Sequence, residues 1–211
     1  MKALSSRGPD GFPGRFYQLF WPLIEEDLLK AINFFFQRRC SLRLVSHSFI
    51  ALIPISLHVD SLDLYRPIYL CNTFYKIITK VMDLILQPIM KHLISHHQSA
   101  FIKDRSTHHN TLLAHELVKY LNQGKPRACI KVDLKKAFDS VHWNFLEKIL
   151  RSCQFSDHWI SLRMACVSSP QYSVLINGAP GGIFSLSVVF VKVTLYPLCC
   201  LLLLCNHSPR I

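Results

Sequence analysis

The chain has 211 residues, of which 50% are hydrophobic and 18% charged, a balance that excludes a disordered protein and allows a sizeable core. Lys and Arg number 24 against 13 for Asp and Glu, which gives a formal net charge of +11. This surplus favours an anionic partner, either nucleic acid or a membrane surface, and by itself distinguishes neither. The mean hydropathy of +0.24 is high for so basic a protein.

The eight cysteines and the N-terminus limit the cellular context. No two cysteines form a C-x-x-C pair, which speaks against a zinc ribbon or a thioredoxin-like motif. The first residues lack the apolar stretch of a secretory signal. We therefore expect reduced thiols and a nuclear or cytoplasmic location rather than secretion.

The eleven histidines raise the question of a metal site. His92 and His96 have the helical i, i+4 spacing, and His97, His108 and His109 follow. Zinc needs three or four converging ligands, and no Cys or acidic residue completes a familiar spacing here. Ordinary surface and groove histidines are the favoured interpretation.

The first third of the chain predicts a loop, a helix and two extended segments. Residues 8–14 are rich in Gly and Pro and predict a loop. Apolar residues near period 3.6 predict an amphipathic helix over 15–39, in which Pro22 allows a kink or a second helix start. We expect a short strand over 49–54 and an extended stretch over 63–68.

The later elements alternate between helix and strand. Asp139 or Ser140 would cap the helix that begins near residue 140. From Ile183 onward the chain becomes apolar and nearly free of charge. We expect helices over 71–92, 111–122, 140–151 and 156–167, a strand over 128–134, and a strand with a turn over 172–178.

Residues 131–140, K-V-D-L-K-K-A-F-D-S, carry the strongest chemical signal. A carboxylate at the end of a buried strand, here Asp133, can bind a divalent cation, and the following turn exposes backbone carbonyl oxygens as further ligands. Phe138 would begin the next helix and project toward the same cleft. When the segment is taken alone, an ordinary strand–turn–helix with a capping Asp and a core Phe is the favoured interpretation.

Other short segments follow a fixed order along the chain, and together they make a specific pattern. The segments are G-P-D-G-F (8–12), F-I-A-L-I-P (49–54), D-L-Y-R-P-I-Y-L-C-N-T-F-Y-K-I-I-T-K (63–80), H-Q-S-A-F-I-K-D-R-S (97–106), L-L-A-H-E-L-V (112–118), K-V-D-L-K-K-A-F-D-S-V-H-W (131–143) and A-C-V-S-S-P-Q-Y-S-V-L-I-N-G (165–178). In that order they strongly resemble the reverse transcriptase of LINE-type non-LTR retrotransposons, especially the forms abundant in plant genomes. The resemblance extends from about residue 8 to residue 182.

The resemblance implies an α+β fold, with partial fingers and palm and an incomplete antiparallel sheet. Such enzymes extend a DNA primer on an RNA template with deoxynucleotides, by two-metal phosphoryl transfer. Asp133 matches the first catalytic aspartate, a Mg²⁺ ligand, and Leu134 would add its backbone carbonyl. Phe138 matches the aromatic gate beneath the nucleotide sugar, which leaves no room for a ribose 2′-OH. Arg66 and Arg105 match basic finger positions that would meet template or triphosphate phosphates, with a surface or fold-stabilising ion pair as the alternative for each.

The resemblance also implies a division of the chain. We expect an N-terminal loop over 1–14, a fingers-like helical region over 15–127, a partial palm over 128–182, and an apolar tail over 183–211 that is not part of the fold. Four positions depart from the family pattern, and two of them, Ile55 and Asp104, would weaken contact with nucleic acid if they face it, because one loses a Lys and the other gains an Asp. The four are Ile55 for a usual Lys, Tyr69 for Ser, Asp104 for Gly and His109 for Asp.

The tail departs from the family altogether. The family continues with R-G-L-R-Q-G-D-P-L-S-P-L-L-F and later a hairpin with Y-A-D-D, and these 211 residues contain neither. Residues 188–201 read V-V-F-V-K-V-T-L-Y-P-L-C-C-L. If the reading frame is shifted by one base, codons that encode these residues can also encode every residue of R-G-L-R-Q-G-D-P-L-S-P-L-L-F. We therefore infer a frameshift or a mis-joined exon between about Phe184 and Val188. A membrane anchor over 183–205 is the rival interpretation, and Lys192 and Pro197 count against it.

Three functions follow as hypotheses. The first is a truncated retrotransposon reverse transcriptase fragment that is inactive alone, because two-metal catalysis also needs the carboxylates of the missing hairpin. The second is a non-catalytic nucleic-acid-binding remnant, with salt-sensitive affinity. The third is a tail-anchored, membrane-associated protein, which the shifted frame makes unnecessary. The alternative to a nucleic-acid-binding remnant is a non-functional product that folds poorly, because its palm sheet lacks the central hairpin.

Overall fold

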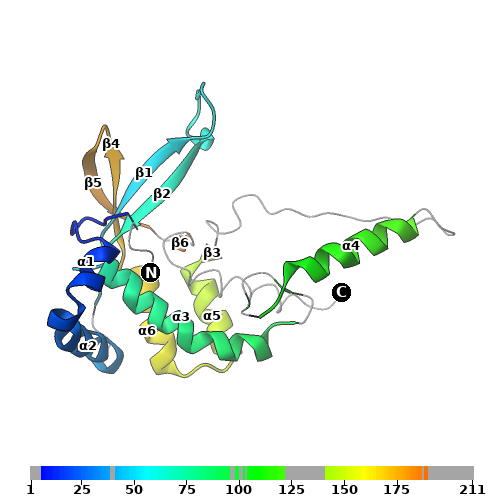
Figure 1. Cartoon of the computed structure of the whole chain (residues 1–211), viewed down its shortest axis with the longest axis horizontal. Coiled ribbons are helices and arrows are strands. Elements are labelled where there is room, and N and C mark those ends of the chain that lie inside the picture. The colour runs from blue at the N-terminus through cyan, green and yellow to red at the C-terminus, as the bar shows by residue number, and fades with distance from the viewer. Residues whose placement is uncertain are drawn as a thin grey trace.

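The computed structural model describes residues 6–38, 41–95, 98–99, 102, 104–121, 141–186 and 188–189 (Figure 1). The α+β class predicted from the sequence is confirmed in these residues. In chain order the elements are α1 (Gly14–Leu19), α2 (Trp21–Arg38), β1 (Ser48–Pro54), the 3₁₀ turn η1 (Leu62–Leu64), β2 (Tyr65–Cys71), α3 (Thr73–Leu93), α4 (Thr107–Leu121), β3 (Val141–His142), α5 (Trp143–Ser152), α6 (Asp157–Ser168), β4 (Gln171–Ile176), β5 (Ala179–Ser185) and β6 (Val188–Val189).

The larger sheet of the described residues has four strands in the order β2-β1-β4-β5. β1 pairs antiparallel with β2 and parallel with β4, and β4 pairs antiparallel with β5. The sheet is therefore mixed, whereas the sequence led us to expect an antiparallel one. The parallel pair brings Ser48 beside Tyr172, so strands distant in sequence are neighbours in the sheet. β3 and β6 form a separate two-stranded sheet.

One sheet joins the two regions into which the sequence divides the chain. β1 belongs to the region 15–127 and β4 to the region 128–182, yet the two strands pair directly. β5 continues to Ser185, so the first residues of the segment 183–211 are strand residues. Within the described residues, the sheet thus crosses the boundary between the expected fingers and palm.

The first helical region is two helices and not the single helix expected over 15–39. α1 ends at Leu19, and the chain bends at Phe20 before α2 begins at Trp21. Pro22 lies in the first turn of α2, where its missing N–H costs no helical hydrogen bond. The break therefore falls where the proline allows a second helix start.

α3 is the central helix of the fold and contributes to two hydrophobic clusters. Its first half packs Ile78 and Met82 against residues of α2, the sheet and α6. Its second half packs Leu86 and Met90 against α5 and α6. The hydroxyl of Tyr75 donates a hydrogen bond to the Cys166 carbonyl at 2.7 Å, which ties α3 to α6. The expected helix over 71–92 is confirmed with bounds shifted by one or two residues.

The helices α5 and α6 form the rest of the second cluster. The N-cap of α5 is His142 and makes no side-chain hydrogen bond, so Asp139 and Ser140 do not occupy the capping position that we expected for them. The two residues of β3 lie between them and the helix. Ser156 caps α6 through a hydrogen bond from the Trp159 amide, as its residue type favours.

α4 differs from the other long helices because none of its side chains is buried. In Figure 1 it extends away from the rest of the described chain. The expected strand over 128–134 lies outside the described residues. Among the helices that the structure describes, none is long and apolar enough to cross a membrane.

Candidate functional site

Three of the five residues predicted for the site lie outside the described residues. They are Asp133, Leu134 and Phe138, so their roles as metal ligands and as sugar gate stay predictions. Arg66 and Arg105 are described, and their surroundings differ: the Arg66 side chain is exposed, whereas the Arg105 guanidinium is hydrogen-bonded to backbone carbonyls. The part of the site that the structure describes is therefore the basic residues around the sheet and the end of α3.

Arg66 is an exposed side chain on β2, an edge strand of the sheet. Its Cα is paired with that of Ile53 on β1, so the two side chains share the face of the sheet opposite Ile50 and Tyr69. Ile50 and Tyr69 are buried in the first cluster, which means that Arg66 is on the outer face. An exposed guanidinium on a rigid strand can bind an anion without rearrangement.

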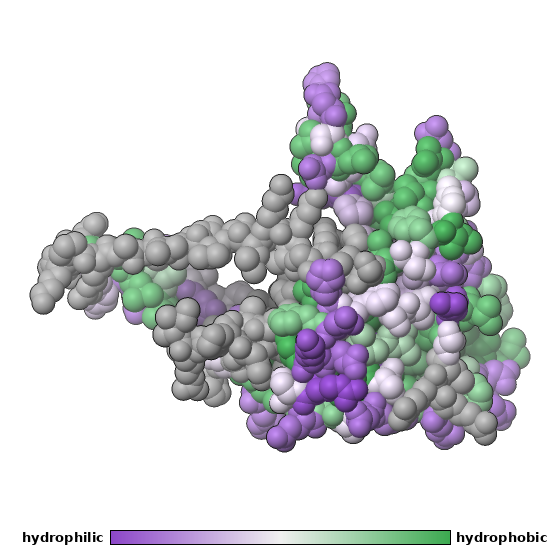
Figure 2. Space-filling model, turned by 180° about the vertical axis from the view of Figure 1, so that it is seen from behind, coloured by the Kyte–Doolittle hydropathy of each residue, from purple (hydrophilic) through white to green (hydrophobic). Residues whose placement is uncertain are grey.

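The outer face around Arg66 is apolar. Ile53 and Ile68 flank the arginine and are 47% and 43% exposed, and half-buried Leu70 and Leu175 continue the surface over β2 and β4. Figure 2 shows hydrophobic surface on both hairpins, with hydrophilic residues at both tips. The guanidinium of Arg66 therefore stands among apolar side chains on this face.

The side chain of Arg105 is hydrogen-bonded to backbone carbonyls. Its guanidinium donates hydrogen bonds to the carbonyls of Ser95 at 2.6 Å, Gln98 at 2.7 Å, and Lys91 and Ile94, both at 3.1 Å. These carbonyls belong to the end of α3 and the loop that follows it. Two roles were considered for Arg105, binding of phosphate and an ion pair that stabilises the fold. These contacts favour a fold-stabilising role, in which the partners are backbone carbonyls and not a carboxylate.

The neighbouring Asp104 is one of the four departures from the family pattern, and the structure shows its backbone conformation and its partner. Its φ is 67°, in the left-handed region where glycine is the least strained residue, and the family usually has Gly there. Its carboxylate forms an ion pair with Lys91. The negative charge that we expected to repel phosphate is therefore paired with a lysine of α3.

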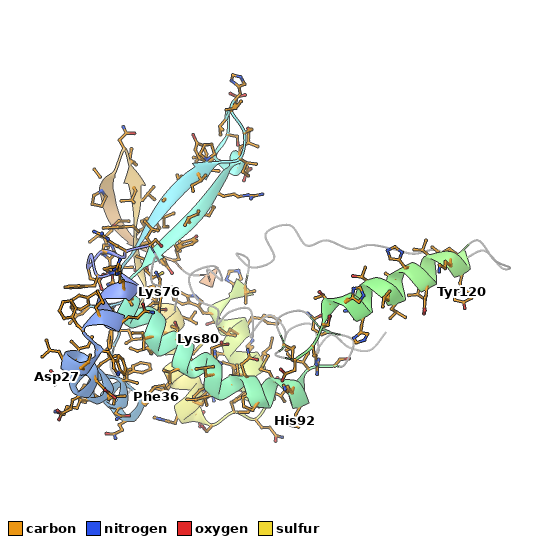
Figure 3. The ribbon with its side chains drawn as sticks, viewed as in Figure 1. Asp27, Phe36, Lys76, Lys80, His92 and Tyr120 are labelled. Carbon is orange, nitrogen blue, oxygen red and sulfur yellow. The ribbon has the colours of Figure 1, made fainter. Side chains whose placement is uncertain are left out.

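Two further lysines on α3 are also engaged. Lys76 donates a hydrogen bond to the Ser6 carbonyl at 3.3 Å, and Lys80 pairs with the buried Asp83 at 2.9 Å. Figure 3 shows both lysines toward the N-terminal half of α3 and His92 at the other end. Part of the positive charge of the chain thus stabilises the fold.

The structure brings no metal site together in the residues that it describes. Among them, no group of three or more His, Cys, Asp and Glu side chains is placed to hold a metal ion. Burial raises the pKa of the Cys71 thiol to about 11 and that of Cys166 to about 12. Both thiols are therefore protonated at neutral pH, which makes them poor ligands and poor nucleophiles.

Asn72 is a structural residue that the sequence reasoning missed. Its side-chain oxygen accepts a hydrogen bond from the Asp10 amide at 3.1 Å, and its side-chain nitrogen donates to the Val45 carbonyl at 3.0 Å. It also stands at the N-cap of α3. Asparagine immediately before a helical pattern was the available signal, because this residue type favours that position.

Comparison with known proteins defines the class. Residues 59–204 match the family model described as reverse transcriptase (RNA-dependent DNA polymerase), which is more than half of the chain and makes it a nucleic-acid polymerase domain by class. The chain belongs to the reverse transcriptase family. The matched range includes residues 131–140 and ends within the apolar tail.

The chain also resembles a much longer protein. It is 25% identical over 173 residues to the "Transposon TX1 uncharacterized 149 kDa protein" of Xenopus laevis. The aligned part is 82% of this chain and 13% of that protein. The similarity thus concerns one segment of the longer relative.

Proposed function

We propose that this chain is a segment of a retrotransposon reverse transcriptase, with the fingers and the first part of the palm. The observation that carries the proposal is the family match over 59–204, within which K-V-D-L-K-K-A-F-D-S stands at 131–140. The name of the Xenopus laevis relative supports a transposon origin. The substrates proposed for the intact enzyme are an RNA template, a DNA primer and deoxynucleotides.

Asp133 and Leu134 would hold Mg²⁺ in this proposal. A carboxylate oxygen and a backbone carbonyl oxygen are ligands that Mg²⁺ prefers, so the donor set is chemically suitable. The metal would supply charge stabilisation for phosphoryl transfer when it is bound. Phe138 would exclude a ribose 2′-OH by its volume, and Arg66 would bind phosphate from the outer face of the sheet.

We further propose that these 211 residues alone do not polymerise. Two-metal catalysis needs several carboxylates around the metals, and the sequence has no Y-A-D-D motif to add to Asp133. Primer extension on an RNA template with Mg²⁺ tests this proposal. No extension is expected, whereas extension that Asp133→Ala abolishes would contradict the inactivity and support the family activity.

Residual binding of nucleic acid is the second candidate function, favoured by the formal net charge of +11. Binding carried by phosphate contacts weakens steeply with salt, because each contact releases a condensed counterion. Titration of a fluorescent RNA–DNA hybrid across a salt series measures this slope. A flat response would exclude the second candidate.

The domain plan remains a proposal in a modified form. We retain the loop over 1–14 and the change of reading frame between about Phe184 and Val188, and we add Ala179–Ser185 to the palm sheet because β5 pairs with β4 up to Ser185. A coding sequence whose neighbouring frame encodes R-G-L-R-Q-G-D-P-L-S-P-L-L-F over residues 188–201 is expected. Nucleotides that cannot encode this motif would exclude the frameshift.

A further inference from the structure

The C-terminal end of α3 presents backbone carbonyls that need donors. The last turn of any helix leaves its carbonyl oxygens without partners in the helix, and the helix dipole places negative charge there. In this helix the Ile94 amide bonds back to the Met90 carbonyl at 3.1 Å. The carbonyls of Lys91 and Ile94 receive their hydrogen bonds from the side chain of Arg105.

The guanidinium of Arg105 reaches beyond the helix as well. One nitrogen, Nη1, donates to Ser95 and Gln98, and the other, Nη2, donates to Lys91 and Ile94. One side chain thus connects the last turn of α3 with the loop after it. Only a planar fork with several N–H groups can serve carbonyls in so many directions, and the single ammonium of lysine cannot.

Neighbouring residues hold the loop from two more sides. Ile102 is 4% exposed and packs in the second cluster with Leu86 and Met90. Asp104 takes its left-handed conformation and pairs with Lys91. Because α4 begins at Thr107, these contacts determine how the chain leaves α3 and enters α4.

We propose that Arg105 is a positioning residue that fastens the start of α4 to the end of α3, and that it does not bind phosphate. The part of this proposal that concerns phosphate rests on the proposed function, in which Arg66 is the arginine that contacts phosphate. The family match over 59–204 includes both Arg105 and Asp133.

The first experiment compares hydrogen exchange in three variants. Arg105→Ala and Arg105→Lys are expected to speed exchange at the Ile94, Gln98 and Arg105 amides by about tenfold or more, because both remove the fork. Arg66→Ala is the matched control and leaves these amides unchanged. Protection in Arg105→Lys equal to that of the unaltered chain would overturn the proposal, since charge alone would then suffice. If Arg105→Ala does not fold, the lysine variant alone gives the answer.

The second experiment measures the salt slope of binding to a fluorescent RNA–DNA hybrid. Arg66→Ala is expected to reduce the slope by about one ion, whereas Arg105→Ala leaves the slope unchanged. A slope reduced by about one ion in Arg105→Ala, with exchange unchanged, would overturn the proposal. If the unaltered chain binds no hybrid, the proposed binding function fails, and the exchange experiment still decides the role of Arg105.

Discussion

Gly8 lies so close to Asn72 that no side chain fits between them. A Cβ at Gly8 would come within 2.4 Å of both the backbone nitrogen and the side-chain oxygen of Asn72. The same loop holds α3 through a hydrogen bond from the Thr73 hydroxyl to the Phe12 carbonyl at 2.8 Å. The glycine-rich loop is therefore a packed part of the fold, although it precedes residues 59–204, which the family model matches.

Gly8→Ala is expected to lower the free energy of unfolding by about 1–3 kcal/mol, because the added methyl group forces backbone apart. Urea denaturation followed by circular dichroism measures the change. Gly182→Ala is the matched control, because a Cβ there meets nothing within 4 Å and its effect should stay within about 0.5 kcal/mol. Equal stability of the two variants would contradict the close contact at Asn72.

Asp104 should tolerate glycine better than alanine. Asp104→Ala removes the ion pair with Lys91 and keeps a side chain at a φ of 67°, whereas Asp104→Gly removes the pair and relaxes the backbone. We expect the alanine variant to be less stable than the glycine variant by about 1 kcal/mol. Thermal melts of both variants give the difference, and a more stable alanine variant would contradict the left-handed backbone at residue 104.

The buried thiols predict a dependence of stability on alkaline pH. Burial raises the folded-state pKa of Cys71 from its ordinary 9.0 to about 11, so the folded chain holds this proton more tightly than the unfolded chain. The resulting contribution to stability is complete below pH 9.0 and is lost as pH rises to about 11. Urea melts between these values should show a smaller loss in Cys71→Ala than in the unaltered chain.

The same burial predicts which cysteines react. At pH 8, a thiol reagent followed by peptide mass spectrometry should leave Cys71 and Cys166 unmodified in the folded chain, since both are 1% exposed. Cys153 is half-buried and should react faster. Denaturant should bring all three to a similar rate. Rapid labelling of Cys166 without denaturant would contradict the packing of α6 against α3.

Substitution of one leucine in α5 and one in α4 tests whether α4 is packed like the other helices. Leu150 in α5 is fully buried, so Leu150→Ala should cost about 2–5 kcal/mol. Leu117 in α4 is 56% exposed, and Leu117→Ala should change the free energy of unfolding by less than about 0.5 kcal/mol. Urea denaturation compares the two, and a loss near 2 kcal/mol at Leu117 would mean that α4 has a packing partner.

The sequence predicted the elements whose pattern is local. α3 and α6 were expected as helices over 71–92 and 156–167, and the hairpin strand β1 as a short strand over 49–54. The parallel register of Ser48 with Tyr172 was not predictable, because no local signal specifies which distant strand is the neighbour. The mixed sheet is a consequence of that long-range pairing.

The candidate site was predictable to a smaller extent. Arg66 and Arg105 were equivalent in the sequence as basic residues in family-like segments. The structure separates them because the partners of Arg105 are backbone carbonyls, whose positions depend on how a whole loop folds. The left-handed conformation of Asp104 was indicated by the usual glycine, but the ion pair with Lys91 needed the fold.

The parallel pairing of β1 with β4 also has a consequence for synthesis on the ribosome. The β1–β2 hairpin emerges early, but Ile50 and Tyr69 cannot be fully covered until β4 has been translated about a hundred residues later. The nascent chain therefore carries an open strand edge until β4 is available to pair with β1. All four strands of the described sheet precede residue 186, so a message whose reading frame changes after that point would still encode these four strands.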